Sequence, residues 1–132
     1  MKRWLIALLV LTLAVGSLAL VASAAQKTKM VMLTASGISP RTANVEKGTT
    51  VIWVNNTNGS LGLFFSKGKE VEAVCAAPSR FALDSEGRYN AQGIPAGGTA
   101  SVCFLEAGKY EYDVVVQEKV TGGAYKGMVV VK

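Results

Sequence analysis

Short runs of β-branched and aromatic residues, separated by glycine-rich turns, recur along the chain from Thr28 to its last residue. The clearest run is Thr49–Asn55, which reads TTVIWVN. β-branched and aromatic side chains suit the half-buried surface of a sheet, and glycines suit the turns that join strands. The pattern restricts the chain to an all-β fold and predicts a sandwich or barrel of about seven or eight strands.

Alternation marks a second strong strand, in which Tyr110, Tyr112 and Val114 are interleaved with Glu111 and Asp113. Such a period of two is typical of a strand with one face toward the core. Weaker runs predict further strands at residues 28–34, 43–46, 61–66, 71–76, 99–105 and 125–131. Residues 77–92 are less regular, because turn-forming residues there are mixed with apolar ones.

The N-terminus has the pattern of an export segment. Lys2 and Arg3 precede an uncharged run, Trp4–Ala25, which ends in Ala22-Ser23-Ala24. This order is typical of a cleaved secretory signal, and the run is also long enough to span a bilayer as a retained anchor. We therefore expect residues 1–25 to be a signal peptide or single anchor helix and residues 26–132 to form one domain. Either interpretation places that domain in the periplasm, outside the cell, or on the outer side of the cytoplasmic membrane.

The charge and the cysteine content of the chain indicate which partners and which cellular compartment to expect. The formal net charge is +5, but beyond Lys2-Arg3 of the export segment no basic cluster is denser than Lys67-Gly68-Lys69, so the chain lacks the footprint of a nucleic-acid-binding protein. Cys75 and Cys103 are the only cysteines, and in an oxidising compartment we expect them to form a disulfide. The alternative, a thiolate metal site, is a poor one without histidine partners.

Several segments together resemble the cupredoxins, the small blue copper proteins of the plastocyanin and azurin type. Ile38-Ser39-Pro40 and then VEKGTTVIWVN at residues 45–55 resemble their opening strands. IPAGG at residues 94–98, Cys103-Phe104, GKYEY at residues 108–112 and the run around Gly127, Val129 and Val131 resemble their last strands. The resemblance spans most of residues 38–131 and is weakest over residues 71–92. It implies a Greek-key β-sandwich, here preceded by an N-terminal hydrophobic helix.

The copper ligands of that family are missing. Cupredoxins bind copper through two histidines, a cysteine and usually a weak axial methionine. Allowing one residue of slippage, the resemblance places these ligands at Leu61, Val114, Gln117 and Tyr125, none of which is a good copper ligand. The chain also contains no histidine. We therefore expect no type 1 copper and no other cofactor.

Other metal sites are weaker hypotheses. Met30 and Met32 would share one face of a strand and could in principle hold Cu(I), with Met128 as the remaining soft donor of the mature chain. Methionines fill the cores of strands far more often than they bind a metal. Asp84, Glu86 and Asn90 are close in sequence but lack the spacing of a calcium loop, and a turn explains them equally well.

Catalysis finds no support in the sequence. Without histidine the chain cannot form a Ser-His or Cys-His pair. Glu111 and Asp113 share a strand face, but their alternation with apolar residues indicates a solvated face. We expect a protein that is not an enzyme.

A cupredoxin-like domain without copper is best interpreted as a binding or assembly module, for example an accessory subunit of a membrane or envelope complex. Leu61, Val114, Gln117 and Tyr125 then either form a partner face or fill the vacated pocket as core. Residues 4–25 would contact the membrane in an uncleaved chain. The alternatives are a copper-binding electron-transfer protein with unusual ligands, and a surface or filament subunit that self-associates through strand edges.

Overall fold

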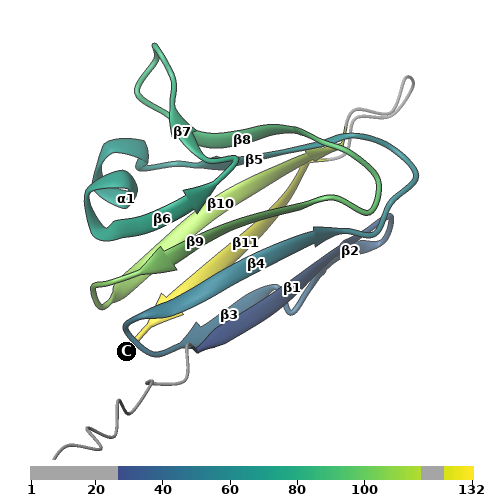
Figure 1. The fold of residues 1–132 in the computed structure, drawn as a ribbon. Helices are drawn as coiled ribbons and strands as arrows, with labels where there is room; N and C mark the ends of the chain where they lie inside the picture. Colours follow the sequence, from purple (N-terminus) through teal and green to yellow (C-terminus); the bar gives the residue numbers. More distant parts are fainter. Residues whose placement is uncertain (1–26, 117–123) are drawn as a thin grey trace, which may run out of the picture.

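Two β-sheets packed face to face make up the computed structural model, which describes residues 27–116 and 124–132 (Figure 1). The first sheet has five strands in the order β2-β1-β4-β9-β6. These are β1 (Thr28–Thr34), β2 (Gly37–Ser39), β4 (Thr49–Asn55), β6 (Cys75–Ser79) and β9 (Thr99–Phe104). The predicted all-β sandwich is confirmed, whereas the predicted signal or anchor at residues 1–25 lies outside the described residues.

The second sheet has six strands in the order β3-β11-β10-β5-β8-β7. These are β3 (Thr42–Val45), β5 (Leu61–Phe65), β7 (Ala82–Leu83), β8 (Tyr89–Ile94), β10 (Gly108–Val116) and β11 (Ala124–Val131). The predicted count of strands is too low by three. β2 and β7 contain only three and two residues and leave no periodic pattern, and β8 begins within residues 77–92, where turn-forming residues are mixed with apolar ones. Within the described residues, no helix has the length and apolar character needed to cross a membrane.

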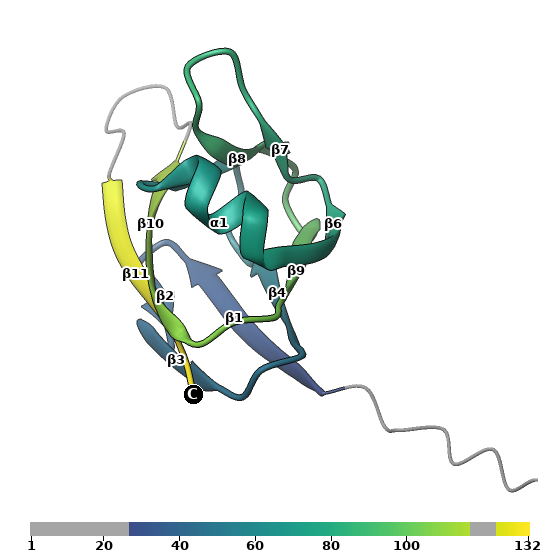
Figure 2. The same ribbon diagram turned by 90° about the vertical axis from the view of Figure 1, so that its left-hand side faces the viewer.

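One predicted strand is wrong. Residues 71–76 were expected to be extended, but Gly68–Val74 forms a short helix, α1, and the chain becomes extended only at Cys75. Helix α1 lies across one end of the sandwich, between the two sheets (Figure 2). It is held there by its buried Val71 and by Gly68, where an added Cβ would lie 2.3 Å from the Gly87 carbonyl oxygen. A helix start with backbone this close has no room for any residue but glycine.

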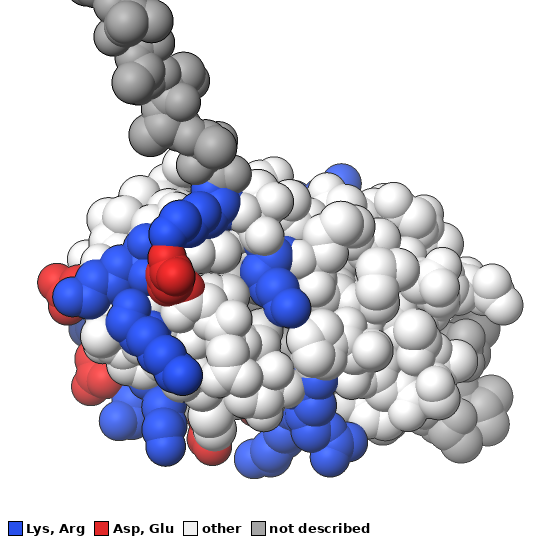
Figure 3. Space-filling model, turned by 90° about the horizontal axis from the view of Figure 1, so that it is seen from below, with Lys and Arg blue, Asp and Glu red and all other residues white. Residues whose placement is uncertain are grey.

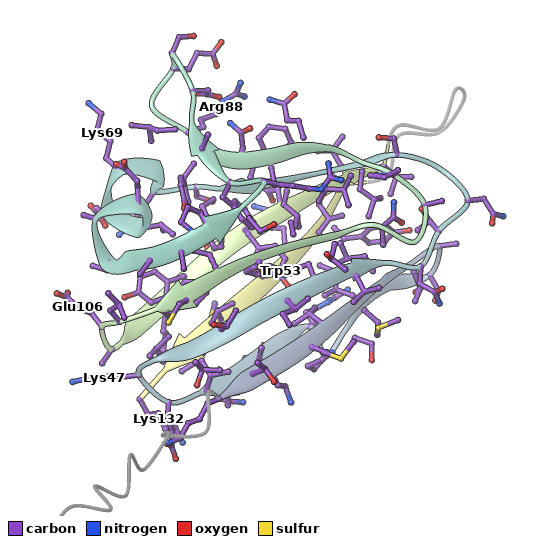
Figure 4. All side chains as sticks on the ribbon, viewed as in Figure 1. Lys47, Trp53, Lys69, Arg88, Glu106 and Lys132 are labelled. Atoms are coloured by element: carbon purple, nitrogen blue, oxygen red, sulfur yellow. The ribbon has the colours of Figure 1, made fainter. Side chains whose placement is uncertain are left out.

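The core is centred on Trp53, whose side chain points inward from β4 (Figure 4). The Trp53 ring makes edge contacts with Phe65, Phe81 and Tyr112, at centroid distances of 5.9, 5.5 and 5.4 Å. Edge-to-face pairs of this kind contribute beyond the apolar area that they bury. Both sheets contribute to the cluster, so it joins the two layers of the sandwich.

Candidate functional site

The sequence-predicted site lies at the end of the sandwich opposite α1, where β5 begins, β10 ends and β11 begins (Figure 1). Val114 pairs with Leu63 on one side and with Tyr125 on the other. Leu61 pairs with Val116, one step further toward the end of the sheet. Three of the four expected copper-ligand positions therefore lie on three adjacent strands, while the fourth, Gln117, lies outside the described residues.

Leu61 and Val114 are buried, with 0 % and 1 % of their surfaces exposed. Both lie at inward positions of the pleat, because alternate residues of a strand point to opposite faces of the sheet. Their burial agrees with the second of the two interpretations offered by the sequence, in which they belong to the core. Tyr125 is half-buried, and its hydroxyl donates a 2.9 Å hydrogen bond to the Ala35 carbonyl oxygen between β1 and β2.

A buried asparagine that the sequence analysis did not single out holds the loop above this pocket. Asn55 is fully buried at the end of β4, and its Nδ2 donates to the carbonyl oxygens of Gly59 and Ile94 at 2.8 and 2.9 Å. Its Oδ1 accepts hydrogen bonds from the Thr57 backbone N–H at 2.9 Å and from the Thr57 hydroxyl at 2.7 Å. The sequence signal was present, because Asn55 occupies an inward position after Val51 and Trp53, where a polar residue needs partners.

Backbone hydrogen bonds at Asn55 and Asn56 tie three loops together. The Asn55 N–H donates to the Gly98 oxygen at 2.9 Å, and the Gly97 N–H donates to the Asn55 oxygen at 2.8 Å. The Asn56 N–H donates to the Leu33 oxygen at 2.8 Å, next to the turn between β1 and β2. We call residues 35–36, 56–60 and 95–98, which these bonds bring together, the uncharged rim.

None of the residues of the uncharged rim carries a charge, and most of their side chains are exposed. In Figure 3, which views the molecule from below, charged side chains gather on the left, at the α1 end. The right-hand part of the same view is almost entirely white. On the face drawn in Figure 3, charge is therefore concentrated at the α1 end of the sandwich.

The predicted disulfide is not formed, because Cys75 and Cys103 are both free thiols. They lie on neighbouring strands, but Cys75 pairs with Phe104 and Cys103 pairs with Ala76. This register places Cys75 on the core side of the sheet with Phe104 and places Cys103 on the outer side, so their side chains diverge. Burial, and secondarily the neighbouring Cys103, raises the pKa of the Cys75 thiol to about 12, which leaves it a protonated, unreactive group.

The soft donors of the described residues do not converge. Met30 and Met32 share the outer face of β1, as expected from their spacing, and Met30 is 56 % exposed. Met128 lies on β11 in the other sheet, paired with Glu111 and Thr42. Within residues 27–116 and 124–132, no group of three or more His, Cys, Asp or Glu side chains gathers around one point.

Asp84 and its neighbours form a turn that is already satisfied within the protein. The Asp84 carboxylate accepts hydrogen bonds from the backbone N–H groups of Glu86 and Arg88, from Arg88 Nε and from Asn90 Nδ2, at 2.8–3.0 Å. The hydrogen bond from the Arg88 backbone is the main cause that lowers the pKa of Asp84. Arg88 also pairs with Glu86 at 3.0 Å, so this cluster joins β7 to β8 and its carboxylates are not free to hold a cation.

Comparisons with known proteins find similarity in the fold but not in the sequence. No protein-family model matches the chain, and no curated protein sequence matches it. Solved structures do match: the reduced Cu(I) form of an amicyanin mutant at pH 4 superposes with a TM-score of 0.56 at 20% sequence identity. That match covers 84% of this chain and 88% of the amicyanin chain. A second amicyanin mutant, in its reduced state, superposes with a TM-score of 0.55 at 21% identity over the same shares of the two chains.

The chain has the cupredoxin fold. The copper implied by that fold does not fit the residues of this chain. A type 1 centre needs two imidazoles and a thiolate beside one another, whereas the chain has no histidine and its two cysteines lie on β6 and β9 of the other sheet. At the corresponding end, this cupredoxin-like domain has the apolar side chains of Leu61 and Val114 in its core.

Proposed function

We propose that this cupredoxin-like domain is an exported, non-catalytic binding module that contacts a protein partner through the uncharged rim, as an accessory subunit of a membrane or envelope complex. The observation that carries the proposal is the replacement of a ligand pocket by buried Leu61 and Val114 beneath an organised loop surface. Apolar packing supports the loops from below, and the hydrogen bonds of Asn55 hold them in one arrangement. A surface ordered before binding loses less entropy when a partner associates.

The composition of the rim supports contact with a protein. Its exposed residues include Asn56, Asn58, Pro95 and Ala96, and none would bring an unpaired charge into an interface. The cores of protein interfaces are depleted in charged residues, because a buried, unpaired charge is costly. Two clefts of the described surface have no rim residue in their lining: one lies against α1 and includes Val71, and the other lies on the outer face of the second sheet and includes Phe64. The rim therefore favours a surface contact over the capture of a small molecule.

The alternative of a self-assembling filament subunit is disfavoured by the sheet edges. The edge strands β2, β3 and β7 contain only three, four and two residues. The remaining edge strand, β6, contains Pro78, which has no N–H to donate to a further strand. Short edges and edge prolines are the devices by which sheets avoid pairing with other copies.

A matched pair of variants tests the rim. Ala96→Asp places a carboxylate on the rim, and Ala107→Asp places the same carboxylate on an exposed turn at the α1 end. The full-length protein is isolated from its own membranes, its stoichiometric partner is identified by mass spectrometry, and the affinity of each variant for that partner is measured. We expect Ala96→Asp to weaken binding by about tenfold or more, since burying an unpaired charge costs well over 1.4 kcal/mol.

Ala107→Asp should bind the partner as the unaltered chain does. Equal losses in both variants, or none in either, would show that the contact lies elsewhere on the domain. A chain that leaves its native membrane fraction as a lone monomer, with no stoichiometric partner, would contradict the proposal as a whole.

A further inference from the structure

Five lysines surround the point at which residues 1–26 join the domain. Lys27 precedes β1 and Lys29 lies near its start, Lys47 lies in the turn before β4, Lys109 at the start of β10, and Lys132 follows β11. Figure 3 shows blue side chains gathered around the base of the grey N-terminal trace. We call these five residues the basic collar.

Backbone hydrogen bonds fix the collar in place. The Lys47 N–H donates to the Lys132 oxygen at 3.3 Å, and the Thr50 N–H donates to the Lys27 oxygen at 2.9 Å. Lys47 and Lys132 consequently lie together at the lower left of Figure 4. The collar is thus a property of the rigid sheets and does not depend on a mobile loop.

Acidic residues offset only part of this charge. Glu46 forms an ion pair with Lys27, and this contact lowers the pKa of the Glu46 carboxyl, which keeps it ionised. Two further acidic residues are close to the collar: Glu106, in the turn between β9 and β10 (Figure 4), and Glu111, which shares the outward face of β10 with Lys109. The remaining lysines of the collar have no carboxylate partner within salt-bridge distance among the described residues, so they present net positive charge to the solvent.

The length of chain between the collar and the apolar run limits how far the collar can lie from a membrane. The run Trp4–Ala25 is separated from Lys27 by Gln26 alone. Two fully extended residues span about 7 Å. With residues 4–25 in a bilayer, Lys27 therefore lies about one Debye length or less from the lipid headgroups, where attraction between a lysine and an anionic surface is strongest. The other lysines of the collar belong to the same end of the sandwich.

We infer that the basic collar docks on the anionic phospholipid headgroups of the bilayer that holds residues 4–25, and so orients the domain. The uncharged rim is at the opposite end of the strands, and the seven residues of β4 alone extend about 23 Å. Docking by the collar therefore holds the rim away from the membrane, where a protein partner can reach it. This inference rests on the membrane-anchored form of the proposed function.

The test uses the full chain in lipid nanodiscs that contain a gadolinium-chelating lipid. One set of nanodiscs is made of phosphatidylcholine alone and the other also contains phosphatidylglycerol. Paramagnetic broadening of backbone amide signals reports which residues approach the headgroups. With phosphatidylglycerol we expect strong broadening at Lys47 and Lys132 and none at Asn58 or Ala96. In the neutral nanodiscs, or at high salt, broadening at the collar should fall and become more even over the domain.

A double variant and a control of equal charge separate docking from simple tethering. Lys47→Gln with Lys132→Gln should lower the ratio of docked to undocked domain by about thirtyfold, because each lysine near an anionic surface contributes about 1 kcal/mol and 1.4 kcal/mol is a factor of ten. Arg41→Gln with Lys126→Gln removes the same charge from the connection between β2 and β3 and from the outer face of β11, away from the collar, and should leave the ratio unchanged.

The outcomes distinguish docking by the collar from anchoring by residues 4–25. A chain that stays in the nanodiscs but broadens identically with and without phosphatidylglycerol, or responds equally to both double variants, overturns the collar alone. A chain that does not remain with the nanodiscs overturns the anchored form and this inference with it, while binding of a partner at the rim is still tested by the Ala96→Asp comparison.

Discussion

Asn55→Ala should lower the free energy of unfolding by about 3 kcal/mol or more, and should loosen the uncharged rim. The substitution removes all four hydrogen bonds of the Asn55 side chain and leaves the Ile94 carbonyl oxygen and the Thr57 N–H without this partner inside the protein. Each buried polar group deprived of its partner costs about 1–3 kcal/mol. Denaturant unfolding measures the loss, and amide hydrogen exchange over residues 56–60 shows whether the loop opens.

Asn58→Ala is the matched control, because Asn58 is an exposed asparagine in the same loop and no hydrogen bond of its side chain holds the loop. It should change the free energy of unfolding by less than about 0.5 kcal/mol, as is usual for surface substitutions. Similar effects of the two substitutions would show that Asn55 does not organise the rim. The rim would then not be a partner surface that is ordered before binding.

Gly127→Ala should destabilise the domain by about 3 kcal/mol or more, because it forces a methyl group into the buried ring of Tyr112. A Cβ built on Gly127 would lie 2.3 Å from Tyr112 Cζ and 2.4 Å from the hydroxyl oxygen. Tyr112 is only 1 % exposed and packs against Trp53, so its ring cannot move aside without disturbing the core. Overpacking of a filled core typically costs about 1–3 kcal/mol, and this site lies at the severe end of that range.

A double-mutant cycle identifies the cause. Tyr112→Leu removes the atoms that the new methyl group would meet, at a cost of its own. In the Tyr112→Leu background, Gly127→Ala should cost less than about 1 kcal/mol, which gives a large coupling between the two positions. An equal cost of Gly127→Ala in both backgrounds would show that the strain arises from the backbone of β11 and not from the ring.

The strongest strands could be predicted from the sequence because their patterns were local. Residues 28–34 and 49–55 were expected as strands, and β1 and β4 have these bounds. The alternation around Tyr112 and Val114 likewise predicted the buried face of β10. Periodicity reports which face of a strand is buried, and a long half-buried strand supplies enough residues for the pattern to be clear.

Features set by contacts between distant segments could not be predicted in this way. Helix α1 is only seven residues long: Val71 and Val74 have the spacing of one helix face, whereas Val71, Ala73 and Cys75 alternate as in a strand, and so short a segment does not decide between the two. The disulfide was expected from compartment and cysteine count, but the register of β6 against β9 decides which way each thiol points. The basic collar contains residues that are far apart in the sequence, such as Lys47 and Lys132, and only the folded sheets bring them together.

Native mass spectrometry of the full chain, before and after incubation with Cu(II) and a chelator wash, tests the central claim most directly. We predict the mass of the metal-free chain in both samples, with both thiols reduced, since Leu61 and Val114 fill the pocket and no histidine is available. Stoichiometric copper that survives the wash in the unaltered chain would contradict the account.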